Sequence, residues 1–426
     1  MDIALGIDLG TSGVRVLAMD RGGATVAMAE MAMPPPSSVD GHLRQDPEVW
    51  WAAVTETLDQ LRIAVDFDRV AAMAVDGTSG TIVPIGAGGT PLGPASMYND
   101  QAVESDVARV AAVAPRDTAA SGATSPLARA LAMQKTAGTE RIVHQADWVA
   151  GQLSGNFGFS DENNALKTGY DPRRRRWPAW IAQCGLNVRL LPRVVPAGTR
   201  LGVVSPAAVS RFDFAAETAI VAGTTDGCAA FLATGASEPG AGVSSLGTTL
   251  TVKLLSKTPV FSPQFGIYSH RIGDAWLAGG ASNSGGAVLL RYFDKDRMKD
   301  LESRIDPDHP TGRNYYPLLA PGERFPISDP HYPPRMSPRP RDDAQFFQAL
   351  LEGIAGIERL AYDRLREIGA SPLRSLRTVG RGAHNQAWTA IRQRMISVPF
   401  KDAKSEHAAA GAARLAWRGI GVTPDP

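Results

Sequence analysis

The chain has 426 residues, of which 44% are hydrophobic and 20% are charged, a composition typical of a globular protein with two large domains or three small ones. Its 44 Lys and Arg residues nearly balance its 43 Asp and Glu residues, which argues against nucleic acid or an acidic membrane as a partner. No apolar run approaches the ~20 residues that cross a bilayer, no basic secretion signal begins the chain and only two cysteines occur, so we expect a soluble cytoplasmic protein without a disulfide framework.

The first predicted element is a strand, a turn and a second strand within residues 3–20. Ile3, Leu5 and Ile7 alternate with smaller residues, which is typical of a half-buried strand, and Gly10-Thr11-Ser12-Gly13 has the composition of a turn.

A helix is predicted after Asp46, which is suited to cap it, with Pro47 at its first position and Leu61 near its end. A strand over residues 70–75 then leads into Asp76-Gly77-Thr78-Ser79-Gly80.

In the second half, a short strand over residues 219–221 leads into a turn that contains Asp226-Gly227. Helices are predicted over residues 346–368, closed by Gly369, and from about residue 405 to 418, with a Gly-rich turn over residues 380–385 between them.

An internal repeat links the two halves. The segment Leu9 to Leu17 matches the segment Leu246 to Leu254, and both have an apolar strand, a Gly-Thr-Ser or Gly-Thr-Thr turn and a second apolar strand. The repeat predicts two halves that are built alike, each with one such hairpin, although two unrelated hairpins with similar turns are the alternative.

The residues around these turns suit phosphate chemistry. Asp8 ends a strand immediately before Gly10-Thr11-Ser12, whose backbone N–H groups and hydroxyls can hold an anion, and a carboxylate there suits Mg²⁺. Gly247-Thr248-Thr249 offers a second cradle, and Asp226 follows another strand, where it can accept a proton from a hydroxyl. Together they predict phosphoryl transfer from a nucleoside triphosphate, which requires positioning, charge neutralisation and a base.

The chain resembles the FGGY carbohydrate kinases of the actin-like ATPase superfamily over nearly its whole length. The resemblance rests on motifs spread along both halves: Gly6–Ser12, Gln45–Trp51, Asp76–Thr81, Met97–Asp100, Ala222–Asp226, Ser245–Thr249, Gly279–Asn283 and Gly380–Asn385.

This resemblance implies an α/β protein with two actin-like, ribonuclease H-like domains around a central nucleotide and sugar cleft. Residues 1–233 and 407–426 would form the sugar-binding domain with the first hairpin, and residues 234–406 the nucleotide-binding domain with the second. It implies ATP as the phosphoryl donor, Asp226 as the catalytic base and Asp8 as the residue near Mg²⁺.

Within the family, the stretches Asp76–Thr81 and Met97–Asp100 resemble compact D-ribulose and D-xylulose kinases of cyanobacteria and plants. By that likeness Asp8, Ser79 and Asp226 contact the sugar. The residues expected to bind ATP are Gly10, Thr11, Ser12, Gly247, Thr248, Thr249, Gly380, Gly382, Asn385 and Trp388, the last two against the adenine.

One residue departs from the family pattern. Arg381 stands between Gly380 and Gly382, where the family usually has a third glycine. Its guanidinium would bind a phosphate, point to solvent or narrow the adenine pocket.

The sequence therefore predicts an ATP-dependent kinase that phosphorylates D-ribulose at its terminal hydroxyl, as a monomer or small homo-oligomer whose partners are sugar and ATP. D-Xylulose is the alternative substrate, because the two sugars differ only in configuration at C3. The alternative of another class is a catalytically idle sugar-binding regulator on the same fold.

Overall fold

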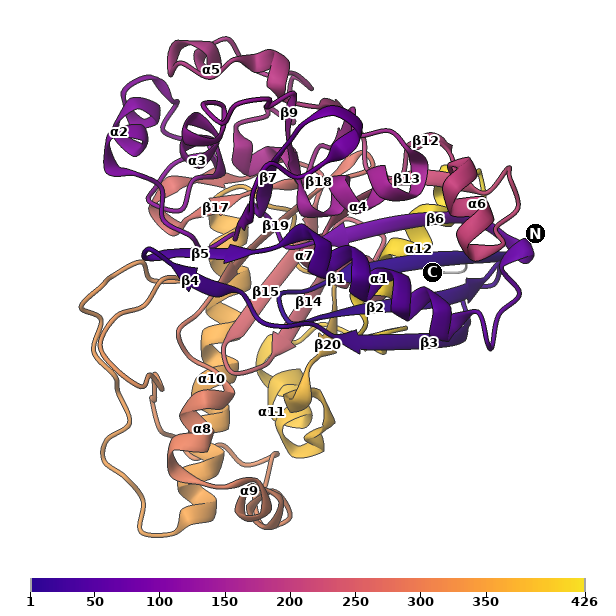
Figure 1. Ribbon diagram of the computed structural model, residues 1–426. Coiled ribbons are helices and arrows are strands. Elements are labelled where there is room, and N and C mark those ends of the chain that lie inside the picture. Colours follow the sequence, from indigo (N-terminus) through magenta and orange to yellow (C-terminus); the bar gives the residue numbers. More distant parts are fainter. Residues whose placement is uncertain (1, 425–426) are drawn as a thin grey trace. The chain divides into compact units, whose positions relative to one another are not determined.

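The computed structural model describes residues 2–424 (Figure 1). Met1 and residues 425–426, which are predicted to belong to the first domain, lie outside the described residues. The chain divides into two compact units. The first unit contains the chain up to Gly235, the segment His270–Gly273 and the chain from His407 onward, and the second contains Ala236–Ser269 and Asp274–Glu406.

The main sheet of the first unit has six strands in the order β12-β13-β6-β1-β2-β3. Strand β1 pairs antiparallel with β2 and parallel with β6, which in turn pairs parallel with β13. The strand, turn and strand predicted within residues 3–20 are confirmed, and the strand predicted at 70–75 continues to Gly77. The strands are β1 (Ile3–Leu9), β2 (Gly13–Asp20), β3 (Thr25–Ala32), β6 (Val70–Gly77), β12 (Arg200–Val203) and β13 (Ala219–Thr225).

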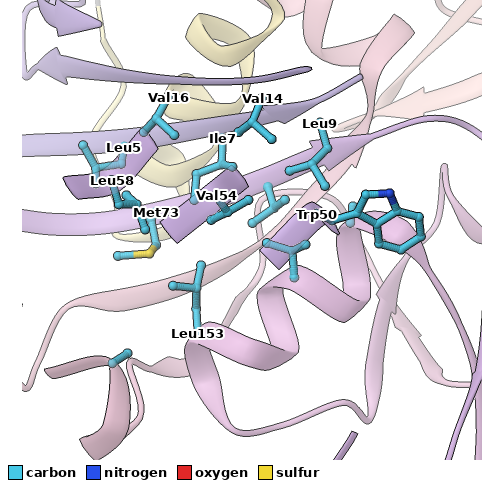
Figure 2. Close-up of a cluster of buried hydrophobic side chains, with 14 of the residues drawn as sticks. Leu5, Ile7, Leu9, Val14, Val16, Trp50, Val54, Leu58, Met73 and Leu153 are labelled. Carbon is cyan, nitrogen blue, oxygen red and sulfur yellow. The ribbon is translucent and has the colours of Figure 1, made fainter. Parts of the chain in front are cut away.

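Helices cover both faces of this sheet, α1 (Pro47–Leu61) on one and α12 (Ala408–Gly419) on the other (Figure 1). The larger side chains of β1, such as Leu5 and Ile7, pack with those of α1 (Figure 2). On the opposite face, a Cβ atom at Gly6 would lie 1.8 Å from the Ala409 carbonyl oxygen, so α12 rests directly on the strand. The expectation of a half-buried strand was therefore wrong, because its small residues are covered by a helix as well.

The predicted start of α1 is confirmed, since the Asp46 carboxylate accepts a hydrogen bond from the Glu48 N–H at 3.0 Å. The first unit also has a five-stranded sheet in the order β4-β5-β8-β7-β9 and a pair of strands, β10 and β11. These smaller elements are β4 (Ser37–Val39), β5 (His42–Gln45), β7 (Ile82–Ile85), β8 (Ala95–Ser96), β9 (Arg141–His144), β10 (Phe159–Asp161), β11 (Arg193–Val195), β18 (His270–Ile272), α2 (Glu104–Val113), α3 (Pro126–Met133), α4 (Gln145–Ser154), α5 (Trp180–Gln183), α6 (Pro206–Phe212) and α7 (Asp226–Ala233).

The second unit has a sheet with the strand order β19-β15-β14-β20-β21. The helix predicted at 346–368 is confirmed as α10, and Gly369 has a φ of +106° immediately after its C-cap. The elements are β14 (Ala241–Leu246), β15 (Leu250–Ser256), β16 (Phe261–Ser262), β17 (Ile267–Tyr268), β19 (Ala275–Ala281), β20 (Ser375–Val379), β21 (Phe400–Lys401), α8 (Gly286–Tyr292), α9 (Lys295–Glu302), α10 (Asp343–Glu367) and α11 (Gln386–Ile396).

The internal repeat extends well beyond the two hairpins. Five strands of the first unit, β3-β2-β1-β6-β13, have the same order and the same directions of pairing as β19-β15-β14-β20-β21 of the second. The prediction of two halves built alike is confirmed. Within residues 2–424, no helix has both the length and the hydropathy needed to span a membrane.

Candidate active site

Three carboxylates gather at one edge of the main sheet of the first unit. Asp8 on β1 is the register partner of Asp76 on the parallel strand β6. Asp76 is also the partner of Thr224 on β13, and Asp226 follows the last residue of that strand. Because the carboxyl ends of neighbouring parallel strands meet at the same edge, the sheet brings Asp8, Asp76 and Asp226 together.

Burial dominates the electrostatics of this cluster. Asp76 is fully buried, and no N–H or hydroxyl group of the described residues donates a hydrogen bond to its carboxylate oxygens. Burial raises the pKa of Asp76 well above its usual range, and the negative charges of Asp8 and Asp226 raise it further. Burial also raises the pKa of Asp8, whereas a hydrogen bond with the Asp76 carboxyl group and the positive charges of Arg15 and His407 act to lower it.

Asp226 is the first residue of helix α7, and not part of a turn as expected from the sequence. The Thr225 hydroxyl caps this helix by accepting a hydrogen bond from the Cys228 N–H at 3.4 Å. Asp226 is half-buried, and its Oδ1 accepts a hydrogen bond from the Gly227 N–H at 2.5 Å. A Thr followed by an Asp and an apolar run is a helix-start signal, so the sequence did contain the evidence for α7.

The first hairpin places its turn beside Asp8. The Gly10 N–H donates to the Gly13 carbonyl oxygen at 2.9 Å, and Ser12 at the tip is exposed. Within residues 2–424, no group of three or more His, Cys, Asp or Glu side chains is arranged to hold a metal ion. The Asp8 carboxylate beside this turn nevertheless fits Mg²⁺, which commonly binds through one or two carboxylates together with waters and substrate phosphates.

Ser79 follows β6 with its hydroxyl unused. Its Oγ is buried and has no hydrogen-bond partner in the described part of the chain, while its carbonyl oxygen accepts from Lys167 Nζ at 3.2 Å. The next residue, Gly80, has a φ of +101°, and its carbonyl oxygen accepts from Arg129 at 2.6 Å. Two cations thus fix the backbone around Ser79.

Arg129 and Lys167 were missed by the sequence analysis. Arg129 is buried and also donates to the carbonyl oxygens of Ser96 and Met97 at 2.9 and 2.8 Å, so it joins the Ser79 turn to the Met97 segment. An arginine within the otherwise apolar helix Pro126–Met133 is the sequence signal that could have identified it.

In the second unit, the second hairpin and the Gly-rich turn line one cavity of about 910 Å³. Thr249, which was predicted to bind ATP, is exposed at the hairpin tip and is not among the lining residues. The other predicted nucleotide residues of this unit all line the cavity: Gly247, Thr248, Gly380, Gly382, Asn385 and Trp388.

Packing explains the glycine at 382. A Cβ atom there would lie 2.6 Å both from Leu246 Cβ and from Trp388 Cζ3. Trp388 is only 3% exposed, so it forms part of the cavity wall, and Asn385 caps α11 by accepting from the Trp388 N–H at 2.6 Å. Arg381 lines the same cavity and is exposed.

Helices α8 and α9 supply cavity residues that carry no sequence motif. Lys295 and Lys299 lie four residues apart, on one face of α9, and add positive charge. Leu289 of α8 and Met298 of α9 form an apolar wall together with Phe347 of α10. A charged edge and an apolar wall suit the phosphates and the base of a nucleotide.

Two units that repeat one five-stranded arrangement, each with a Gly-Thr-Ser or Gly-Thr-Thr hairpin, define an actin-like, ribonuclease H-like fold. The N-terminal domain of the FGGY family of carbohydrate kinases matches residues 3–118, and the C-terminal domain of that family matches residues 242–420. The chain belongs to the FGGY family of carbohydrate kinases.

Relatives and solved structures agree with this assignment. The chain is 25% identical over 417 residues to a xylulose kinase of Lactococcus lactis, covering 90% of this chain and 81% of the relative. It is 27% identical over 427 residues to a xylulose kinase of Streptomyces coelicolor, covering 94% and 84%. A ligand-bound xylulose kinase structure from Lactobacillus acidophilus matches with a TM-score of 0.85 at 17% identity, covering 100% of this chain and 91% of the other, which confirms the predicted fold.

Proposed function

We propose that this carbohydrate kinase transfers the γ-phosphoryl group of ATP to the terminal hydroxyl of D-ribulose, giving D-ribulose 5-phosphate. The observation that carries the proposal is the meeting of Asp8, Asp76 and Asp226 at one sheet edge in a member of the FGGY family. Asp226 is the general base that accepts the proton of the terminal hydroxyl. Its half-buried carboxylate remains accessible to a ligand, whereas Asp76 is fully buried.

The other candidate residues bind and orient the sugar and the nucleotide. Asp8 and Ser79 contact sugar hydroxyls, and the unused Ser79 Oγ supports this role, because a buried hydroxyl without a partner is costly unless a ligand completes it. The turns Gly10–Ser12 and Gly247–Thr249 offer N–H groups and hydroxyls to phosphates, and the cavity lined by Asn385 and Trp388 takes the nucleoside. Mg²⁺, when bound near Asp8, would neutralise phosphate charge.

D-Xylulose is the second candidate substrate, and the xylulose kinases among the relatives favour it. D-Ribulose is preferred on the resemblance of Asp76–Thr81 and Met97–Asp100 to the compact ribulose and xylulose kinases. Release of ADP, measured with ATP, Mg²⁺ and a panel of free sugars, tests both. We expect the higher kcat/KM with D-ribulose; a higher value with D-xylulose would move the assignment to that sugar. Absence of ADP release with every sugar would favour a catalytically idle sugar-binding regulator.

A further inference from the structure

The second unit has another cavity, of about 470 Å³, which shares no lining residue with the nucleotide cavity among the described residues. It lies between helix α10, residues 310–316 and the end of α11. Its volume is within the range of about 300–1,000 Å³ that is usual for small-molecule sites. We propose that this cavity is a binding site for a small phosphorylated metabolite, separate from the kinase site.

The charge of the lining carries the first part of the argument. Four arginines line the cavity, Arg313, Arg335, Arg359 and Arg394, against one carboxylate, Glu352. Glu352 is already paired with Arg394 at 3.2 Å. None of the other three guanidinium groups has a carboxylate partner within residues 2–424: those of Arg313 and Arg335 donate to neutral oxygen atoms, and that of Arg359 makes neither a hydrogen bond nor an ion pair. Guanidinium groups bind phosphate through paired, charge-assisted hydrogen bonds, so the cavity selects an anion.

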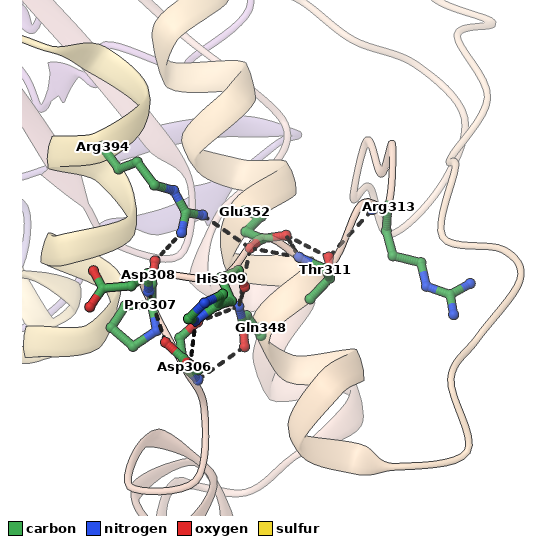
Figure 3. Close-up of polar contacts among 9 residues, drawn as sticks. All are labelled: Asp306, Pro307, Asp308, His309, Thr311, Arg313, Gln348, Glu352 and Arg394. Atoms are coloured by element: carbon green, nitrogen blue, oxygen red, sulfur yellow. Dashed lines mark hydrogen bonds and ion pairs between the residues drawn. The ribbon is translucent and has the colours of Figure 1, made fainter.

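The wall of the cavity is held in place without a ligand (Figure 3). Gln348 on α10 donates to the carbonyl oxygens of Asp306 and His309, both at 2.7 Å. One turn later, Glu352 accepts from the Thr311 N–H at 3.1 Å and from its hydroxyl at 2.5 Å. These bonds attach the 306–311 segment to the helix, so little ordering entropy would oppose binding.

Gly356 in helix α10 provides a second, independent observation in favour of a binding site. Gly353 and Gly356 lie inside α10, where glycine stabilises a helix less than alanine does. Packing explains Gly353, because a Cβ atom there would lie 2.8 Å from Pro317 Cδ. It does not explain Gly356, where a Cβ atom would meet only Met395 Cε, at an ordinary contact of 3.6 Å. The missing side chain at 356 instead leaves the cavity open.

The lining also indicates that the anion has an organic part. Tyr315, Tyr316 and Tyr332 line the cavity together with the apolar residues Ile357 and Leu360. Free phosphate gains nothing from these surfaces, whereas the carbon skeleton of a phosphate monoester can pack against them. A phosphate monoester should therefore bind more tightly than inorganic phosphate.

Calorimetric titration of the full-length protein with D-glucose 6-phosphate tests this site, with a non-hydrolysable ATP analogue present at saturation to fill the nucleotide cavity. We expect one molecule bound per chain, more tightly than inorganic phosphate. Arg359→Glu should weaken binding at least tenfold because it reverses a charge in the cavity lining. Gly356→Leu should have an effect of the same size because the new side chain fills the cavity. Arg366→Glu is the matched control, because Arg366 lies on the same helix but outside the cavity, paired with Asp363 at 3.5 Å.

Absence of binding to the parent protein would overturn the proposal, as would unchanged affinity in both cavity variants. Affinity for the ATP analogue checks that each variant is folded. Because Arg359 is exposed, we expect Arg359→Glu to fold normally, so its affinity alone tests the proposal if Gly356→Leu does not fold. The readout is binding at a site apart from the kinase residues, so its failure leaves the proposed kinase activity standing.

Discussion

The guanidinium group of Arg129 donates a hydrogen bond to the carbonyl oxygen of Gly80 at 2.6 Å, within a buried region of the first unit. Further bonds reach the carbonyl oxygens of Ser96 and Met97. Burial lowers the pKa of Arg129 to about 10, so the group keeps its charge at neutral pH. This buried cation, together with Lys167, thus fixes the backbone that presents Ser79.

Replacing this cation tests whether it positions the sugar site. Arg129→Lys keeps the charge but loses the planar, multiply donating group, and a lost charged hydrogen bond costs about 1.5–3 kcal/mol. We expect the KM for the sugar to rise roughly tenfold or more while the KM for ATP changes little. Steady-state kinetics with each substrate varied in turn measures both. Arg109→Lys, at an exposed arginine, is the control, and an unchanged sugar KM in Arg129→Lys would contradict the positioning role.

Ser79→Ala tests how the two ketopentoses are distinguished. The Ser79 hydroxyl can serve a sugar hydroxyl in one configuration, and the epimer leaves a polar group unpaired, at a cost of about 1–3 kcal/mol. We expect the variant to bind sugar less well and to lose most of the difference in kcat/KM between D-ribulose and D-xylulose. If Ser79 only completes a turn, the ratio of the two values will be the same as in the parent enzyme.

Asp226→Asn tests the general base. A carboxamide cannot accept the hydroxyl proton, and general-base catalysis contributes roughly 10²–10⁴-fold. We expect kcat to fall by that factor while calorimetry shows sugar binding nearly intact. Asp213→Asn, at an exposed residue with a φ of +62°, which asparagine tolerates, should leave kcat unchanged. Turnover within threefold of the parent in Asp226→Asn would remove Asp226 from this role.

Arg381→Gly restores the usual glycine of the family. Arg381 lines the nucleotide cavity, and the family pattern has glycine at this position, so we expect ATP to bind equally well or more tightly in the variant. Calorimetric titration with ATP measures the change. Binding more than tenfold weaker would show instead that the guanidinium contacts a phosphate, an interaction of about 1.5–3 kcal/mol.

Glu162 should make the stability of the first unit depend on pH. Glu162 is 1% exposed, and neither carboxylate oxygen has a hydrogen-bond partner among residues 2–424, although Arg175 Nε lies 3.5 Å from Glu162 Oε2. Burial raises the pKa of Glu162 to about 7, against the opposing charges of Arg175 and Arg271. The folded protein then binds the proton more tightly than the unfolded chain. The stabilisation that comes from protonated Glu162 is complete below the unfolded pKa of about 4.3 and is lost as the pH rises through 7.

Glu162→Gln replaces the titrating group by a neutral isostere. As the pH rises from 5 to 8, we expect the free energy of unfolding of the variant to increase relative to that of the parent by on the order of 2 kcal/mol. Melting temperatures of both proteins at the two pH values measure this difference. A constant offset between the proteins would show that Glu162 does not titrate in this range.

Local patterns in the sequence were sufficient to predict much of the fold and to select the candidate site residues, whose roles stay predictions. The strand and turn around Asp8, the helix cap at Asp46 and the repeated hairpins each depend on a few adjacent residues, so periodicity and turn chemistry predict them. The same holds for Asp226, whose place at the end of a strand was predicted even though the helix that begins there was missed.

Only the tertiary structure determined which distant residues meet. The contact of Asp76 with Asp8 follows from the register of two parallel strands, and the role of Arg129 follows from the packing of α3 against the turn at Gly80. The arginine-lined cavity likewise depends on loops that hydrogen bonds hold against α10. Such contacts join residues that are far apart in the chain. Their energies come from strand pairing, hydrogen bonds and burial between distant segments, which cannot be predicted from any short stretch of sequence.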